Sequence, residues 1–396
     1  MSLVTINDEY LSAIGTSIRN KNGTTDLIKP KDMAAAIDAI TGGGGVDLDI
    51  PVITGNCKYR FINNGWNWVI NQLGNQLKTN NIINSDGMFD GCNDVSLTNI
   101  PFEINYDKNY PISLRYMFRD CRYLTSFFKF NNCKPTTTES MFENCHRLRY
   151  LPEGIETWFD WSAIESSTDV GYGDRRRMFK NCFSLRSVPM EFLKHENPYI
   201  YPSYSMYYEL FYECDALDEV VGLPINTGTQ AKTSNMFVDT FTNCGRLKNM
   251  TFETNEDGSP IVVKWKNQTI DLSQYVGWIH NLPHLLDYNS GIDDTFKVAS
   301  SNIWEMYKDA PDWWTMEKYY SRYNLDSAVA TINSLPDASE YLATAGGTNT
   351  IKFESEAGAN EPYEDANGKQ AFKKISNLTE EQIAVAAAKG WTVSLV

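Results

Sequence analysis

The chain has 396 residues, which is more than one compact core usually holds, so two or three structural units are expected. Its hydrophobic fraction of 42% is enough for folding. Its formal net charge is −15. Acidity can serve solubility alone, and it disfavours nucleic acid as a partner, because phosphate binding needs a basic face. No apolar run reaches the roughly 18 residues of a membrane helix, and the first residues do not resemble a signal peptide. We therefore expect a soluble chain made in a cytosol, with no membrane insertion.

Residues 1–41 are predicted to form a small helical module, with two short helices separated by a turn at Asn22 and Gly23. Two short helices cannot bury their apolar stripes alone, so these stripes are predicted to dock on a partner or on a copy of the chain. The alternative is a generic two-helix cap. The candidate docking residues are Leu11, Ile14, Ile18, Met33 and Ile37.

The stretch from Leu11 to Ile37 is similar to an N-terminal module of predicted tail and minor structural proteins of bacteriophages with Gram-positive hosts. This resemblance implies a virion component that is anchored to other virion proteins by its N-terminus. Residues 42–46 follow as a Gly-rich linker, which predicts freedom between the anchor and the rest of the chain.

A short motif returns six times between residues 88 and 250: Phe, two residues, Cys, two residues, then an aliphatic residue. Phe and Cys at this spacing share one face of a helical turn, and the aliphatic residue is predicted to open a short strand. An internal repeat of this kind predicts an α/β solenoid over residues 47–255, with a short helix and a strand in each coil. The predicted structural ladder consists of Phe89, Cys92, Phe118, Cys121, Phe142, Cys145, Phe179, Cys182, Phe211, Cys214, Phe241 and Cys244.

Three interpretations of the cysteines are open. Zinc would favour close pairs of ligands, but the closest ladder cysteines, Cys121 and Cys145, lie 24 residues apart. Disulfides along the ladder are opposed by geometry and by a reducing compartment. Buried thiols fit best, because Cys is small and apolar. No metal or cofactor is therefore predicted.

The repeat units resemble the BspA-like class of leucine-rich repeats, whose units read roughly Ala/Met-Phe-x-x-Cys-x-x-Leu-x-x-Ile. The resemblance covers about residues 81 to 255 and implies a leucine-rich-repeat-like solenoid made for interaction rather than catalysis. Coils of uneven length, such as the stretch from Trp158 to Arg177, predict insertions gathered on a binding face.

Residues 256–325 lack the motif and are rich in Trp and Tyr. This atypical region is predicted to form core that covers the end of the solenoid, and the alternative is an exposed aromatic surface that binds a partner. Residues 326–396 are predicted to form a helix and strand cap. Helices are expected over 328–335 and 383–389, the second capped by Thr379 and ended by Gly390, with strands over 348–353 and 391–395. A helix, Lys-Gly-Trp and a strand are also common at the C-terminus of BspA-like proteins, which implies a last degenerate coil.

The sequence offers little for catalysis. His280 and His284 are four residues apart, but Pro283 lies between them and no zincin Glu accompanies them. His146 and His195 are predicted to be surface residues. Asp312, which precedes Trp313 and Trp314, is the first candidate for glycan hydrolysis, because two carboxylates can cleave glycans. No catalytic residue is predicted.

The leading hypothesis is a non-enzymatic bacteriophage virion structural protein of the tail or head fibre or receptor-binding type, located in the virion. Its N-terminus would contact other virion proteins, and its repeats would contact a glycan or protein of the host surface. A homo-oligomer is possible, although no long heptad run supports a coiled coil. The alternatives are a bacterial BspA-like surface adhesin and a glycan depolymerase of a phage tail.

Overall fold

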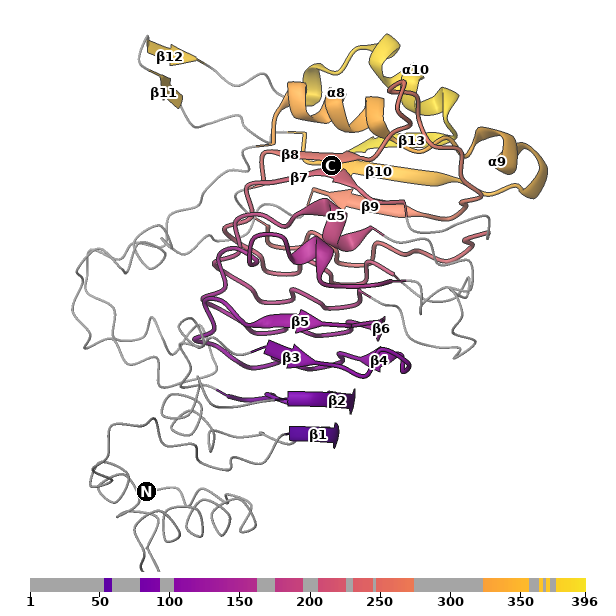
Figure 1. Cartoon of the computed structure of the whole chain (residues 1–396). Coiled ribbons are helices and arrows are strands. Elements are labelled where there is room, and N and C mark those ends of the chain that lie inside the picture. The colour runs from indigo at the N-terminus through magenta and orange to yellow at the C-terminus, as the bar shows by residue number, and fades with distance from the viewer. Residues whose placement is uncertain are drawn as a thin grey trace, which may run out of the picture.

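The computed structural model describes residues 53–58, 79–92, 103–161, 175–194, 206–225, 231–244, 247–273, 323–355, 363–365, 368–370 and 375–396. These residues form short parallel strand pairs that are stacked one above another, with helices α8 and α10 at the C-terminal end of the stack (Figure 1). The predicted anchor, its docking residues Leu11, Ile14, Ile18, Met33 and Ile37, and the linker lie outside the described residues.

The N-terminal half of the stack is built from three parallel pairs. Strand β1 (Ile53–Asn56) pairs with β2 (Thr79–Asn84), β3 (Glu103–Asn105) pairs with β5 (Lys129–Asn131), and β4 (Ile112–Ser113) pairs with β6 (Pro135–Thr137). A parallel bridge between Ile82 and Tyr106 joins the first pair to the second. The pairs β3–β5 and β4–β6 therefore join segments that flank the second repeat, whereas β1 and β2 precede the first copy of the motif.

The middle of the stack has less regular structure. It contains the 3-10 turn η3 (Ile155–Thr157), the one-turn helix α5 (Met190–Leu193) and the parallel pair of β7 (Glu219–Leu223) with β8 (Asn249–Phe252). Strands β7 and β8 begin two residues after the aliphatic residues Leu217 and Leu247 of their repeats, close to where the motif predicts them.

The C-terminal cap is a three-stranded parallel sheet with helices. Its strand order is β13 (Trp391–Leu395), β10 (Asn349–Phe353) and β9 (Thr269–Leu272). Its helical elements are α8 (Leu325–Ser334), α9 (Ser339–Ala345), η5 (Ile375–Asn377) and α10 (Glu380–Ala388). A separate antiparallel pair joins β11 (Tyr363–Asp365) to β12 (Gly368–Gln370).

Local signals in the cap act as the sequence predicts. The Thr379 side chain caps α10 together with Gln382 in a capping box. After the helix, the Lys389 ammonium donates to the carbonyl of Ile332 (3.0 Å) at the end of α8, and the Trp391 indole donates to the carbonyl of Pro336 (2.8 Å). Gly390 lies between them at a φ of 81°. The Lys-Gly-Trp segment therefore connects the end of α8 to β13 through the hydrogen bonds of Lys389 and Trp391.

The prediction of a short helix in each repeat is wrong, because the Phe–Cys segments are chains of turns. The N–H of Phe118 donates to the carbonyl of Met141 in the next repeat (2.9 Å), whereas the N–H of Cys121 donates back to Phe118 in its own turn (3.1 Å). Along each segment, the N–H groups donate alternately to the next repeat and to a carbonyl of their own turn. An α-helix would use its backbone N–H groups within one segment. Here half of these groups bond the neighbouring repeat, so the segment does not form a helix.

Left-handed residues make this alternation possible. The residue two positions after Phe has a positive φ in every repeat, with values of 59° at Asp120, 64° at Asn144 and 60° at Asn181. Asn, Asp and Gly tolerate this conformation best, and four of the five non-glycine residues at this position are Asn or Asp. The Asn that precedes Cys in three repeats is the signal for turns that the helix prediction missed.

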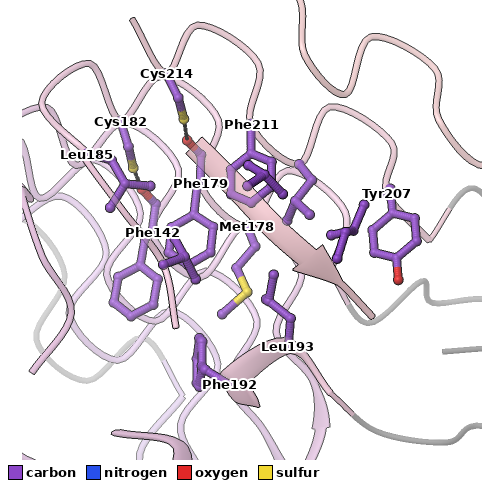
Figure 2. Close-up of a cluster of buried hydrophobic side chains, with 14 of the residues drawn as sticks. Phe142, Met178, Phe179, Cys182, Leu185, Phe192, Leu193, Tyr207, Phe211 and Cys214 are labelled. Atoms are coloured by element: carbon purple, nitrogen blue, oxygen red, sulfur yellow. Dashed lines mark hydrogen bonds between the residues drawn. The ribbon is translucent and has the colours of Figure 1, made fainter. Parts of the chain in front are cut away.

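One continuous core fills the stack and the cap. The Phe rings of successive repeats stack in a column, with centroids 5.7 Å apart for Phe118 and Phe142 and 5.6 Å for Phe142 and Phe179. Figure 2 shows the part of this column formed by Phe142, Phe179 and Phe211, with buried side chains beside it. Packing also runs across the predicted boundary at residue 255, since Phe252 contacts Trp265 (6.3 Å between centroids).

Candidate interaction surfaces

All the predicted ladder residues are buried in one core. The Cys145 thiol donates to the Phe118 carbonyl of the preceding repeat at 3.1 Å, and the Cys182 thiol donates in the same way to Phe142 at 3.1 Å (Figure 2). Five of the six ladder cysteines make such a bond. Each of these carbonyls also accepts a hydrogen bond from the backbone N–H of the cysteine in its own repeat. The thiol of the next repeat therefore binds the second lone pair of the carbonyl oxygen.

The thiols are poorly suited to nucleophilic chemistry. The chain's eight cysteines are buried thiols. Burial raises the pKa of the Cys121, Cys145 and Cys214 thiols well above the ordinary value, and it raises the pKa of Cys57 to about 11. A thiol is reactive as the thiolate, which burial disfavours. The cysteines therefore contribute packing and hydrogen bonds.

The surface beside the Phe column carries charges that alternate from repeat to repeat. In the first four repeats, the residues three positions before Phe are Asp86, Arg115, Glu139 and Arg176. The residues one position after Phe are Asp90, Arg119, Glu143 and Lys180. The Glu139 carboxylate accepts ion pairs from both Arg115 (3.0 Å) and Arg176 (2.8 Å). This surface, which we name the alternating face, neutralises its own charges between neighbouring repeats.

The alternating face continues into the fifth repeat. Arg177 lies 2.9 Å from Glu209, which also contacts Lys180. Burial works against the charge on Glu209, but the hydrogen bonds from Lys180 and Arg177 outweigh it and lower the pKa of this carboxyl. For Glu143 burial dominates, and its pKa is raised. These charges therefore pair between neighbouring repeats.

An amide ladder lies next to the alternating face, at the left-handed position before each Cys. The Asn181 amide donates to the Asn144 side chain at 2.7 Å, and the Asn144 amide donates to the Asp120 carboxylate at 2.8 Å. The left-handed turns thus present side chains that pair from repeat to repeat, as asparagine ladders do in stacked strands. This ladder also is structural.

His146 differs from its prediction as a surface residue. Its ring is half-buried and packs on Phe183 with centroids 4.6 Å apart. Burial and the neighbouring Arg122 lower the pKa of His146 to about 3, so the ring is neutral. The other predicted candidates, His195, His280, His284 and Asp312 with its two Trp residues, lie outside the described residues.

Among the residues that the structure describes, no group of three or more His, Cys, Asp or Glu side chains is arranged to hold a metal ion. Within the same part of the chain, no helix is long and apolar enough to cross a membrane. Comparisons of the chain with protein-family models, curated proteins and solved structures found no match.

Proposed function

We propose that this chain is a non-enzymatic structural protein of a bacteriophage virion, which attaches the particle to the host surface. The leucine-rich-repeat-like solenoid expected from the sequence belongs to this proposal. Its repeats would serve as a rigid body that displays a surface, and residues 1–41 would dock on other virion proteins.

The observation that carries the proposal is the use made of the repeated residues. Phe fills the core, Cys thiols bond carbonyls of the preceding repeat, and the charges of the alternating face pair with each other. The repeated residues thus hold neighbouring repeats together, as is expected of a scaffold. The resemblance of the stretch from Leu11 to Ile37 to phage structural proteins supports the virion setting.

Mass spectrometry of purified particles tests this proposal. Particles banded in a density gradient should contain peptides of this chain at a constant ratio to the major capsid protein. Particles lacking the gene, or carrying a chain without residues 1–41, should lose those peptides while the capsid protein remains. Absence of the chain from wild-type particles would refute the virion proposal.

A further inference from the structure

A second charged surface differs from the alternating face. It lies on the segments that follow the cysteines of the second, third and fourth repeats, and we name it the arginine–tyrosine surface. Its residues are Arg122, Tyr123, Arg147, Arg149, Tyr150 and Arg186.

Hydrogen bonds between repeats bring these segments together. The Arg147 N–H donates to the carbonyl of Arg122 at 3.2 Å, and the Arg186 N–H donates to the carbonyl of Arg149 at 3.0 Å. Residues of three repeats therefore lie side by side, separated by about 4.8 Å per repeat, the usual spacing of paired strands. The surface consequently gathers arginines of three neighbouring repeats, of which Arg149 and Arg186 occupy the same position after Cys.

A guanidinium and a ring of neighbouring repeats are in contact on this surface. The Arg147 guanidinium lies 4.8 Å from the ring centre of Tyr123, within the range of a cation–π contact. Arg147 and Tyr150 are exposed, Tyr150 to 55%. The half-buried His146 lies in the same segment, and its neutral ring adds an aromatic contact rather than a charge.

The charge of this surface changes sign at the fifth repeat. Asp218 lies 3.9 Å from Arg186 and 4.0 Å from Lys248, and Asp215 and Glu219 flank it in the sequence. On the alternating face, by contrast, single repeats alternate in sign. Four arginines in three successive repeats form a basic block on a chain whose net charge is −15.

We propose that the arginine–tyrosine surface binds an acidic polysaccharide. The planar guanidinium forks of the arginines suit carboxylate or phosphate groups, which they can bind through two hydrogen bonds. Tyr150 offers an apolar ring face with a polar hydroxyl, which suits a sugar ring. Arginines spread over three neighbouring repeats suit a polymer that carries acidic groups at intervals. This inference names the ligand class of the proposed attachment function and takes its biological setting from that function.

Binding of the purified full-length chain to four polymers tests the inference. Polygalacturonate supplies sugar rings with carboxylates, a phosphomannan supplies rings with phosphates, dextran supplies rings without charge, and polyphosphate supplies charge without rings. We expect binding to at least one acidic polysaccharide, and binding about tenfold weaker or more to dextran and polyphosphate. Affinity should fall as salt rises, because the arginines are near the surface.

A matched pair of variants locates the site. The double variant Arg147→Gln with Tyr150→Ala changes two exposed residues of the surface, whereas Lys129→Gln with Tyr110→Ala changes two exposed residues elsewhere. The first should lose about tenfold or more in affinity and the second should not change. Circular dichroism verifies that both remain folded.

Four outcomes would overturn the inference: no binding to either acidic polysaccharide, equal binding of dextran, equal binding of polyphosphate, or an unchanged affinity of the first variant. None of these results depends on whether the chain is found in particles. Failure of the ligand proposal and failure of the virion proposal are therefore distinguished.

Discussion

The repeat stack and the C-terminal cap hold parallel segments together by different means. In the cap, regular strands such as β10 and β13 pair residue by residue over their whole length, and regular helices cover them. In the stack, turns replace helices, and half of their backbone donors reach the neighbouring repeat. The cap is therefore determined by signals local to each element, whereas the stack depends on side-chain columns that exist only between repeats.

The largest expected effect comes from breaking the Phe column in the middle of the stack. Phe142→Ala removes a buried ring that stacks on Phe118 and Phe179, and should lower the free energy of unfolding by about 3–5 kcal/mol. Urea denaturation measures the loss. Tyr150→Ala, which truncates an exposed ring, is the control and should change stability little. A similar loss in both variants would contradict the stacked core.

A comparable test of the cap is Gly390→Ala. Gly390 has a φ of 81°, and an added Cβ would lie 2.7 Å from the Leu342 side chain, so strain and overlap act together. We expect a loss of about 1–3 kcal/mol in the free energy of unfolding. The control is Gly258→Ala, because Gly258 has a φ of 79° with no atom near its Cβ position. It should lose less, since it adds strain alone.

The left-handed turns of the stack are tested by two changes at Asn144. Asn144→Ala loses a residue that tolerates a φ of 64° and also removes the amide ladder contacts, so we expect a loss of about 1–2 kcal/mol. Asn144→Gly removes the same contacts without the strain and should retain more stability. If the two variants unfold at the same urea concentration, strain in the left-handed turn is not what selects Asn.

Only part of these contacts can be predicted from the sequence. The ladder residues and the capping box at Thr379 follow from spacing and from local capping rules. The turns at Phe118 and Phe142 could not be told from a helix by spacing, because Phe and Cys three residues apart share a face in both. The arginine–tyrosine surface does not follow from the sequence, because its residues are separated along the chain and meet only through pairing of the repeats.

The two regions should also differ in their response to pH. Burial raises the pKa of four carboxyls in the stack, Asp90, Glu143, Glu213 and Asp215, and only the ion-paired Glu209 among the shifted carboxyls described there has a lowered pKa. In the cap, the pKa of the exposed Glu381 is lowered by hydrogen bonds to backbone N–H and to Thr379. A carboxyl with a raised pKa binds its proton more readily in the folded state, so folding gains stability as pH falls through that pKa towards the ordinary value of about 4.

We therefore expect the stack to become modestly more stable as the pH is lowered from 7 to about 5. Asp215→Asn should reduce this dependence and stabilise the chain at pH 7, because it removes a charge that burial disfavours. Thermal unfolding followed between these pH values measures both effects. An Asp215→Asn variant that is less stable than wild type at pH 7 would show that the carboxylate is stabilising.

The central claim, that this chain attaches particles to a host surface, is tested most directly by competition for adsorption. Host cells are incubated with increasing amounts of the purified full-length chain before particles are added, and free particles are counted. The account predicts a dose-dependent loss of adsorption, which the Arg147→Gln, Tyr150→Ala double variant reproduces only weakly. Undiminished adsorption at a saturating amount of the wild-type chain would contradict an attachment role.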